Sequence, residues 1–464
     1  MLTYFRLMKI SRVHFLLFPL IATLLCSCSQ QEKKKTETVK NQEVKIQKDN
    51  FKTDSVYVSV LSSDGLQHFS VYLPAGWKPE LHLPVMIFFD PHADGSYPVQ
   101  KYNGLASKFD FVLMGSNDAE NGMNFEQTNA IAGKLINEAI LRFSCDSKRI
   151  TLSGFSGGAK AALAAASTHP EVTSVCYCGA AFPAGSLTSI PPALGFAGLK
   201  DMNYTEVIAF NAALDSLPIQ HAVEEWTGKH EWPDSLSFSA AFAWALLKST
   251  AVKNEDQIKL TEAFLSGFEK RSKSADILVK EKSMRELIAF TNDSTMKSIY
   301  IRQLQTLRKN ASLISRIKQE ETIFAKENYS KQQYVQAFEA APLSWWETEI
   351  NKLKTNKSDY SQQRLLGYIS LAGWSFSNNA LKQGNLTAAE KSIAIYGLAD
   401  PENPEQHFFE ACLLAAKHED DKAINALKRS VELGLTKKSK VENEPAFSGL
   451  FSRSDFQEIL RSLN

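Results

Sequence analysis

Few cysteines and almost no net charge characterise this sequence of 464 residues. It has six cysteines, which form no Cys-x-x-Cys pair, and no paired-histidine helical motif appears. This pattern supports no metal site, and we expect no cofactor. The formal net charge is +1, which gives no indication of a nucleic-acid partner, because such partners require a basic surface.

The N-terminal region lacks an apolar run long enough to cross a bilayer comfortably. Residues 15–25 form an apolar run of 11 residues that follows three basic residues. The run ends in Leu25-Cys26-Ser27-Cys28, which resembles the cleavage box of bacterial lipoproteins. Residues 1–27 are therefore expected to be a lipoprotein signal peptide and not part of the fold. A simple N-terminal anchor with two unrelated cysteines is the alternative.

The lipoprotein resemblance implies that Cys28 becomes the lipidated first residue of the mature chain. It implies a place in the bacterial cell envelope, where acyl chains hold the protein at a membrane. We expect the periplasmic or surface face of the outer membrane rather than the inner membrane. Residues 28–52 are polar and charged, with no periodic apolar face, and predict a flexible tether.

The composition of the chain changes near residue 250. Between residues 53 and 250, short β-rich runs alternate with helical segments, which predicts an α/β fold with a doubly wound, mostly parallel sheet. The runs at 56–60 and 68–73 flank Ser-Ser-Asp-Gly and predict an antiparallel hairpin at one sheet edge. The apolar run at 85–89 predicts a strand that is buried on both faces.

Residues 149–170 are typical of a strand, a tight turn and a helix, and the turn reads Gly154-Phe155-Ser156-Gly157-Gly158. A Gly-x-Ser-x-Gly turn of this kind exposes the serine hydroxyl, with glycines where backbones pass closely. The alanine-rich helix that follows can lie close to the sheet and direct its first N–H groups at a developing anion. The motif alone also fits an ordinary turn, but its flanking strand and helix favour Ser156 as a nucleophile.

A nucleophilic serine in this fold requires an acid and a base at the same sheet edge, in the chain order Ser, Asp or Glu, His. Asp201 follows one predicted strand and His230 lies in the exit loop of the next, so both reach the carboxyl edge near Ser156. We predict these three residues as catalytic. The rivals are Asp215 and His221, at the opposite edge, and Glu206, in the first turn of a helix.

Three segments together resemble α/β hydrolases of the secreted esterase type over about residues 54–248: the serine motif, Lys200-Asp201-Met202-Asn203-Tyr204 and His230-Glu231-Trp232-Pro233. The resemblance extends to polyester depolymerase-like and feruloyl esterase-like proteins, and more loosely to dienelactone hydrolases and prolyl oligopeptidases. It implies a Ser156-Asp201-His230 triad and an oxyanion site that includes the Gly157 N–H. The loop after residue 89 lacks the His-Gly-Gly run of many esterases, so the second donor is expected at His92 or Ala93.

These residues predict a membrane-anchored serine hydrolase that cleaves a carboxylic ester through an acyl-enzyme. The ester would be a small molecule or borne on a polymer. A serine peptidase is one alternative, because the same architecture serves both chemistries. The other is an inactive hydrolase shell whose helical tail binds a protein partner. The stretch between residues 179 and 201 is too short to encode a large lid, so helices after residue 250 are expected to wall the pocket.

The remainder of the chain predicts an all-α part, with a helical region at 251–361 and a second unit at 362–464. In the latter, Ala389, Ile393 and Tyr396 recur 34 positions later as Ala423, Leu427 and Ser430. This period resembles tetratricopeptide helix pairs and predicts a tetratricopeptide-like domain. A generic helical domain with a coincidental spacing is the alternative. Trp345 and Trp346 are expected to pack in a core.

Overall fold

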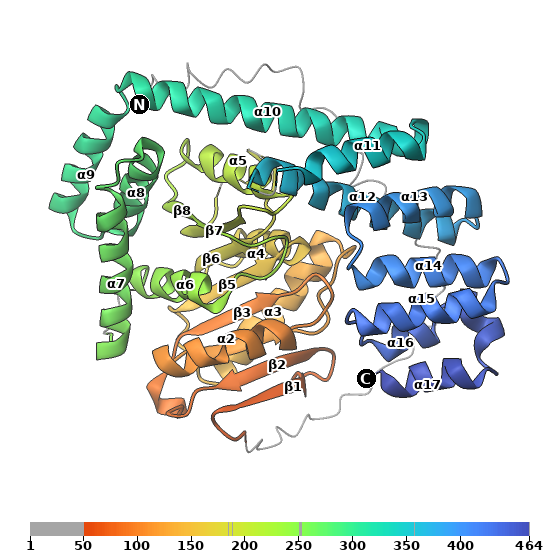
Figure 1. The fold of residues 1–464 in the computed structure, drawn as a ribbon. Helices are drawn as coiled ribbons and strands as arrows, with labels where there is room; N and C mark the ends of the chain where they lie inside the picture. The colour runs from red at the N-terminus through yellow and green to blue at the C-terminus, as the bar shows by residue number, and fades with distance from the viewer. Residues whose placement is uncertain (1–50, 184, 188, 250–252, 357, 464) are drawn as a thin grey trace.

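The computed structural model describes residues 51–463, except 184, 188, 250–252 and 357 (Figure 1). The predicted signal peptide, Cys28 and most of the tether lie outside the described residues. A sheet with flanking helices forms the first part of the described chain, and helices alone form the second part. No helix in the described part is both long and apolar enough to cross a membrane.

Eight strands form one sheet in the order β1-β2-β4-β3-β5-β6-β7-β8. Their bounds are β1 Ser55–Leu61, β2 His68–Leu73, β3 Val85–Phe89, β4 Val112–Ser116, β5 Ile150–Phe155, β6 Val172–Cys178, β7 Ala193–Gly198 and β8 His221–Trp226. β1 pairs with β2 and β2 with β4 in antiparallel fashion, and the remaining pairs are parallel. The predicted α/β fold with a mostly parallel sheet and an antiparallel hairpin at one edge is therefore confirmed.

Helices cover both faces of this sheet. They are α2 Ser96–Phe109, α3 Phe125–Leu141, α4 Gly157–Ala166, α5 Tyr204–Leu214 and α6 Ser235–Leu247. One core contains residues of α3, α4 and α5, and the other contains residues of α2 and α6. Val85 and Ile87 of β3 belong to the first core, whereas Met86 and Phe88 belong to the second. Successive side chains of a strand point to opposite faces of the sheet. Because both faces of β3 are covered by helices, every residue of the run is apolar.

The starts of two helices follow from their local sequence. α3 begins at Phe125, because Asn124 and Gln127 form a capping box that satisfies the first N–H groups. α4 begins at Gly157, within the predicted turn and directly after its serine. The second start matters for function, since it places the Gly157 N–H in the first turn of the helix.

The all-α part consists of α7 Glu255–Arg271, α8 Ile277–Phe290, α9 Ser294–Leu307, α10 Ala311–Ala340, α11 Leu343–Lys354, α12 Tyr360–Lys382, α13 Leu386–Ala399, α14 Pro404–Ala416, α15 Asp420–Glu432, α16 Lys438–Glu442 and α17 Ser454–Ser462. Short 3-10 helices lie at Pro79–Leu81 and Pro445–Leu450. Asn or Asp caps most of the helices from α7 to α12, as at Asn254 and Asp276, which explains their regular starts.

The recurring sequence positions fall on α13 and α15, the second helices of two consecutive helix pairs, α12–α13 and α14–α15. Ala389 and Ala423 are both fully buried, and Ser430 donates to the Pro404 carbonyl. The tetratricopeptide assignment and the boundaries at 250 and 362 remain predictions. Trp346 is fully buried in a core of the helical part, whereas Trp345 is 40% exposed.

Glu286 of α8 lies in a buried charged cluster next to β8. Burial raises its pKa from 4.5 to about 7, although the ammonium of Lys282, 3.8 Å from Glu286 Oε1, favours the charged form. Glu224 repels the carboxylate, while Arg271 lies 3.9 Å from it. Between about pH 4.5 and 7 the folded chain keeps a proton that the unfolded chain releases, so this group makes stability decrease as pH rises through that window.

A Glu286→Gln variant should therefore lose less stability than the parent protein as pH increases. The measurement is the thermal unfolding midpoint of both proteins at about pH 5 and about pH 7.5. Between about pH 5 and about pH 7.5, we expect the midpoint of the variant to fall less than the midpoint of the parent protein. Equal shifts of both midpoints would contradict a buried, neutralised Glu286.

Candidate functional site

Ser156 lies at the sharp turn between β5 and α4 with φ 52° and ψ −122°, an unfavourable conformation for a residue with a Cβ. Two glycines allow this turn. A Cβ at Gly154 would lie 2.0 Å from the Gly158 carbonyl oxygen, and one at Gly158 would lie 2.0 Å from the carbonyl oxygen of Phe89. The Ser156 N–H donates to the Cys178 carbonyl at 2.9 Å, which fixes the turn against the adjacent strand. Local sequence thus positions the serine.

Three of the predicted residues meet at the carboxyl edge of the sheet. His230 Nε2 lies 3.0 Å from Ser156 Oγ, and His230 Nδ1 lies 2.9 Å from Asp201 Oδ1. Ser156 follows β5, Asp201 follows β7 and His230 follows β8. With Nδ1–H donating to the carboxylate, Nε2 is free to accept the serine proton. This row of hydrogen bonds can activate a serine as a nucleophile.

The rival residues lie elsewhere. Asp215 Oδ1 pairs with His221 Nε2 at 3.3 Å, at the end of the sheet where β8 begins. Glu206 accepts the Ala181 N–H at 2.9 Å and lies 3.2 Å from Lys160 Nζ. These three groups therefore have partners outside the row from Ser156 to Asp201.

Contacts with neighbouring residues hold both the acid and the base in place. Asp201 is 1% exposed, and its Oδ1 also accepts the Asn203 N–H at 2.8 Å. Asn203 in turn donates to the Gly179 carbonyl at 2.9 Å. The His230 ring packs against Phe155, with 4.7 Å between ring centroids. Little rearrangement is needed for the three side chains to act together.

Asp90, in the loop after β3, is a residue that the sequence did not single out. It is buried and accepts the Trp232 indole N–H at 2.8 Å, two residues beyond His230. Burial alone would raise the pKa of Asp90, but hydrogen bonds from His92 and Trp232 outweigh it, and the pKa is lowered. An ionised Asp90 thus joins the β3 loop to the histidine loop. The signal in the sequence was its position directly after a buried strand.

The candidate oxyanion donors differ in their surroundings. Gly157 begins α4, where the first N–H groups have no acceptor within the helix. The His92 N–H donates to Asp90 Oδ1 at 2.9 Å, and the Ala93 N–H donates to the Asp90 carbonyl at 3.3 Å. Both N–H groups of this loop are therefore bonded within the loop.

Asn121, from the loop after β4, lies against the serine turn. A Cβ at Gly157 would lie 1.7 Å from Asn121 Oδ1, so the carboxamide occupies the space beside that glycine. The Asn121 N–H donates to the Pro91 carbonyl at 2.9 Å, and His92 pairs with Glu120 in an isolated bridge. The sequence did not indicate Asn121, because its approach depends on pairing between two loops.

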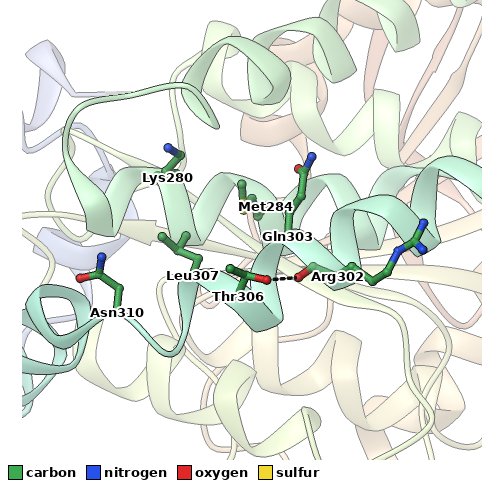
Figure 2. Close-up of a pocket in the computed structure, with 7 residues that line it drawn as sticks. All are labelled: Lys280, Met284, Arg302, Gln303, Thr306, Leu307 and Asn310. Atoms are coloured by element: carbon green, nitrogen blue, oxygen red, sulfur yellow. Dashed lines mark hydrogen bonds between the residues drawn. The ribbon is translucent and has the colours of Figure 1, made fainter.

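Two cavities in the helical part are separate from this edge. One has a volume of about 440 Å³. Figure 2 shows the residues that line it: Lys280, Met284, Arg302, Gln303, Thr306, Leu307 and Asn310. The other, of about 450 Å³, is lined by residues between Ala340 and Ala394. Ser156, Asp201 and His230 line neither cavity. Among the described residues, no group of three or more His, Cys, Asp and Glu is arranged to hold a metal ion.

No protein-family model and no curated protein matches the chain. Similar solved structures include an esterase of Pyrobaculum calidifontis, with 13% identity, 42% of this chain and 84% of that chain covered, and a TM-score of 0.34. Esterase B of Lactobacillus Rhamnosis has 16% identity and a TM-score of 0.35, and the match covers 48% of this chain and 91% of that chain. An S-formylglutathione hydrolase of Staphylococcus aureus has 15% identity and a TM-score of 0.35, and the match covers 42% of this chain and 98% of that chain. At these identities the likeness concerns the fold alone.

Proposed function

We propose that this chain is a serine hydrolase that cleaves a carboxylic ester through a covalent acyl-enzyme. The observation that carries the proposal is the continuous row of hydrogen bonds from Ser156 Oγ through His230 to Asp201. The strained turn supports it, because a serine at φ 52° is maintained against its conformational preference.

In the proposed reaction, Ser156 Oγ attacks the ester carbonyl while His230 Nε2 takes the hydroxyl proton. His230 then gives this proton to the leaving alcohol, and the acyl group remains on Ser156. Water attacks the acyl-enzyme with His230 again as the base, which releases the acid. Asp201 holds the imidazole in the required tautomer and stabilises the imidazolium.

The Gly157 N–H is the first proposed oxyanion donor. The second is either an N–H of the 92–93 loop, released from Asp90, or the amide nitrogen of Asn121 after a half-turn of its carboxamide. The Asn121 carboxamide lies beside Gly157, whereas the His92 N–H donates to Asp90 Oδ1 in this structure. The loss of one such donor typically costs on the order of 10²–10³ in rate.

Ester and amide chemistry can be separated with matched substrates that carry the same short acyl group. We expect the purified protein to hydrolyse the nitrophenyl ester and to leave the nitroanilide largely intact. Comparable rates on both would favour the serine peptidase alternative. No hydrolysis of a broad panel of esters and peptides, together with no labelling by a fluorophosphonate, would instead favour the inactive shell with a partner-binding helical tail.

A further inference from the structure

Three buried charged residues from α10 and α12 form one network beside the sheet. Glu327, Lys331 and Arg364 are 2%, 7% and 4% exposed. Glu327 Oε1 accepts from Lys331 Nζ at 2.7 Å, while Glu327 Oε2 accepts from Arg364 Nη2 at 2.7 Å and from its Nε at 2.9 Å. A single carboxylate thus joins the long helix α10 to α12, whose labels mark them in Figure 1.

Both cations of this network also contact the turn that carries Asp201. Lys331 Nζ donates to the Met202 carbonyl at 2.7 Å, and Arg364 Nη1 donates to the Leu199 carbonyl at 2.9 Å. These two carbonyls lie on either side of Asp201 in the chain. The helices therefore hold the turn at two points that bracket the acid of the proposed triad.

Further contacts extend this junction along the start of α5. Thr205 lies within hydrogen-bond distance of Asn328, with 3.3 Å between Oγ1 and Oδ1, and the Arg364 guanidinium lies 4.7 Å from the centre of the Tyr204 ring. Burial lowers the pKa of Lys331, and the carboxylates of Glu327 and Asp201 oppose that shift. The ammonium group thus interacts with Asp201 as well as with its direct partners.

Burying three charges at this junction is unfavourable in itself, because each ion loses its hydration. Apolar side chains of similar volume would join two parts of a chain as well or better. The charged network differs from apolar packing because its contacts are directional. It makes hydrogen bonds to two defined carbonyl oxygens, and such bonds fix backbone atoms in a way that apolar packing does not.

We propose that Glu327, Lys331 and Arg364 are positioning residues of the hydrolase site, which fix the turn so that Asp201 meets His230 Nδ1. This inference rests on the proposed function and deepens it. The helical part then belongs to the catalytic unit. A displacement of about 1 Å in a reacting group can cost on the order of 10² in rate, so loss of the network should be visible in kinetics.

The test is a double-mutant cycle in the full-length chain. One variant replaces all three charges together, Glu327→Met, Lys331→Met and Arg364→Met, which avoids leaving one buried charge alone. A milder variant, Arg364→Lys, keeps the charge but cannot reproduce the forked contact with Glu327 and Leu199. Each is made in the parent chain and in an Asp201→Asn background. Tyr334→Phe is the control, since it deletes a partly buried hydrogen bond from α10 to Glu349 of α11.

The kcat/KM for a short-chain nitrophenyl ester is expected to fall about 10²-fold in the triple variant and about tenfold in Arg364→Lys. In the Asp201→Asn background both losses should shrink to less than about threefold, because the network then has no acid to position. Tyr334→Phe should cost the same small factor in both backgrounds. If the triple variant does not fold, as judged by its thermal transition, the test is the loss caused by Arg364→Lys in the parent chain compared with its loss in the Asp201→Asn background.

Equal losses with and without the Asp201 carboxylate would overturn the inference, since a purely structural role acts in both backgrounds. So would parent-like rates in a folded triple variant. A parent protein that neither hydrolyses esters nor reacts with a fluorophosphonate gives a different result: it overturns the proposed function, and this inference with it.

Discussion

Replacing Ser156 with alanine is expected to reduce ester hydrolysis by about 10⁴-fold or more, because removing the nucleophile of such a triad typically costs that much. The backbone at this position has φ 52°, a strain that alanine shares, so stability should change little. Steady-state rates on a nitrophenyl ester and the thermal unfolding midpoint test both statements.

The matched control is Ser239→Ala. Its hydroxyl donates to the Leu236 carbonyl within α6, on a helix that carries no residue of the proposed triad. This variant should retain the parent rate. A clean preparation of Ser156→Ala that keeps more than about a tenth of the parent activity would remove Ser156 from the mechanism.

Gly158→Ala is expected to have the second-largest effect. The new methyl group would lie 2.0 Å from the carbonyl oxygen and 2.6 Å from the carbonyl carbon of Phe89. These are backbone atoms of β3 that cannot rotate away, so the turn or the strand must move. We expect a stability loss of about 1–3 kcal/mol from overpacking and a rate loss of at least about 10²-fold, because Ser156 moves with the turn.

Gly104→Ala provides the opposite case. Gly104 lies on the exposed surface of α2, and a Cβ there meets nothing within 4 Å. Alanine should stabilise the protein by about 0.5–1 kcal/mol, because it favours the helix. Thermal unfolding and ester hydrolysis of the two variants should therefore diverge. If both variants behaved alike, the close approach of the β3 backbone would not be the reason for a glycine at position 158.

Local patterns predicted the sheet and the row of three residues because each depends on short stretches of sequence. The apolar run of β3, the glycines of the serine turn and the strand ends before Asp201 and His230 each have a period or a motif of their own. Chain order and the geometry of parallel strands then bring the three side chains to one edge. No long-range information is needed for that step.

The parts that could not be predicted depend on contacts between distant segments. Arg364 meets Leu199 across 165 residues and Lys331 meets Met202 across 129 residues. Nothing in the helical periodicity of α10 or α12 distinguishes these buried charges from solvated ones. The donation of the His92 N–H to Asp90 was missed for a different reason, since it depends on how a short loop satisfies its own donors.

The most direct test of the central claim is to map the attachment site of a fluorophosphonate on the full-length protein by mass spectrometry. We expect a single modified peptide that spans the β5–α4 turn, with the phosphonyl group on Ser156. We also expect much slower labelling in His230→Ala, because the hydroxyl then lacks its base. An unlabelled protein, or a label on another serine at the same rate with and without His230, would show that Ser156 is not the nucleophile.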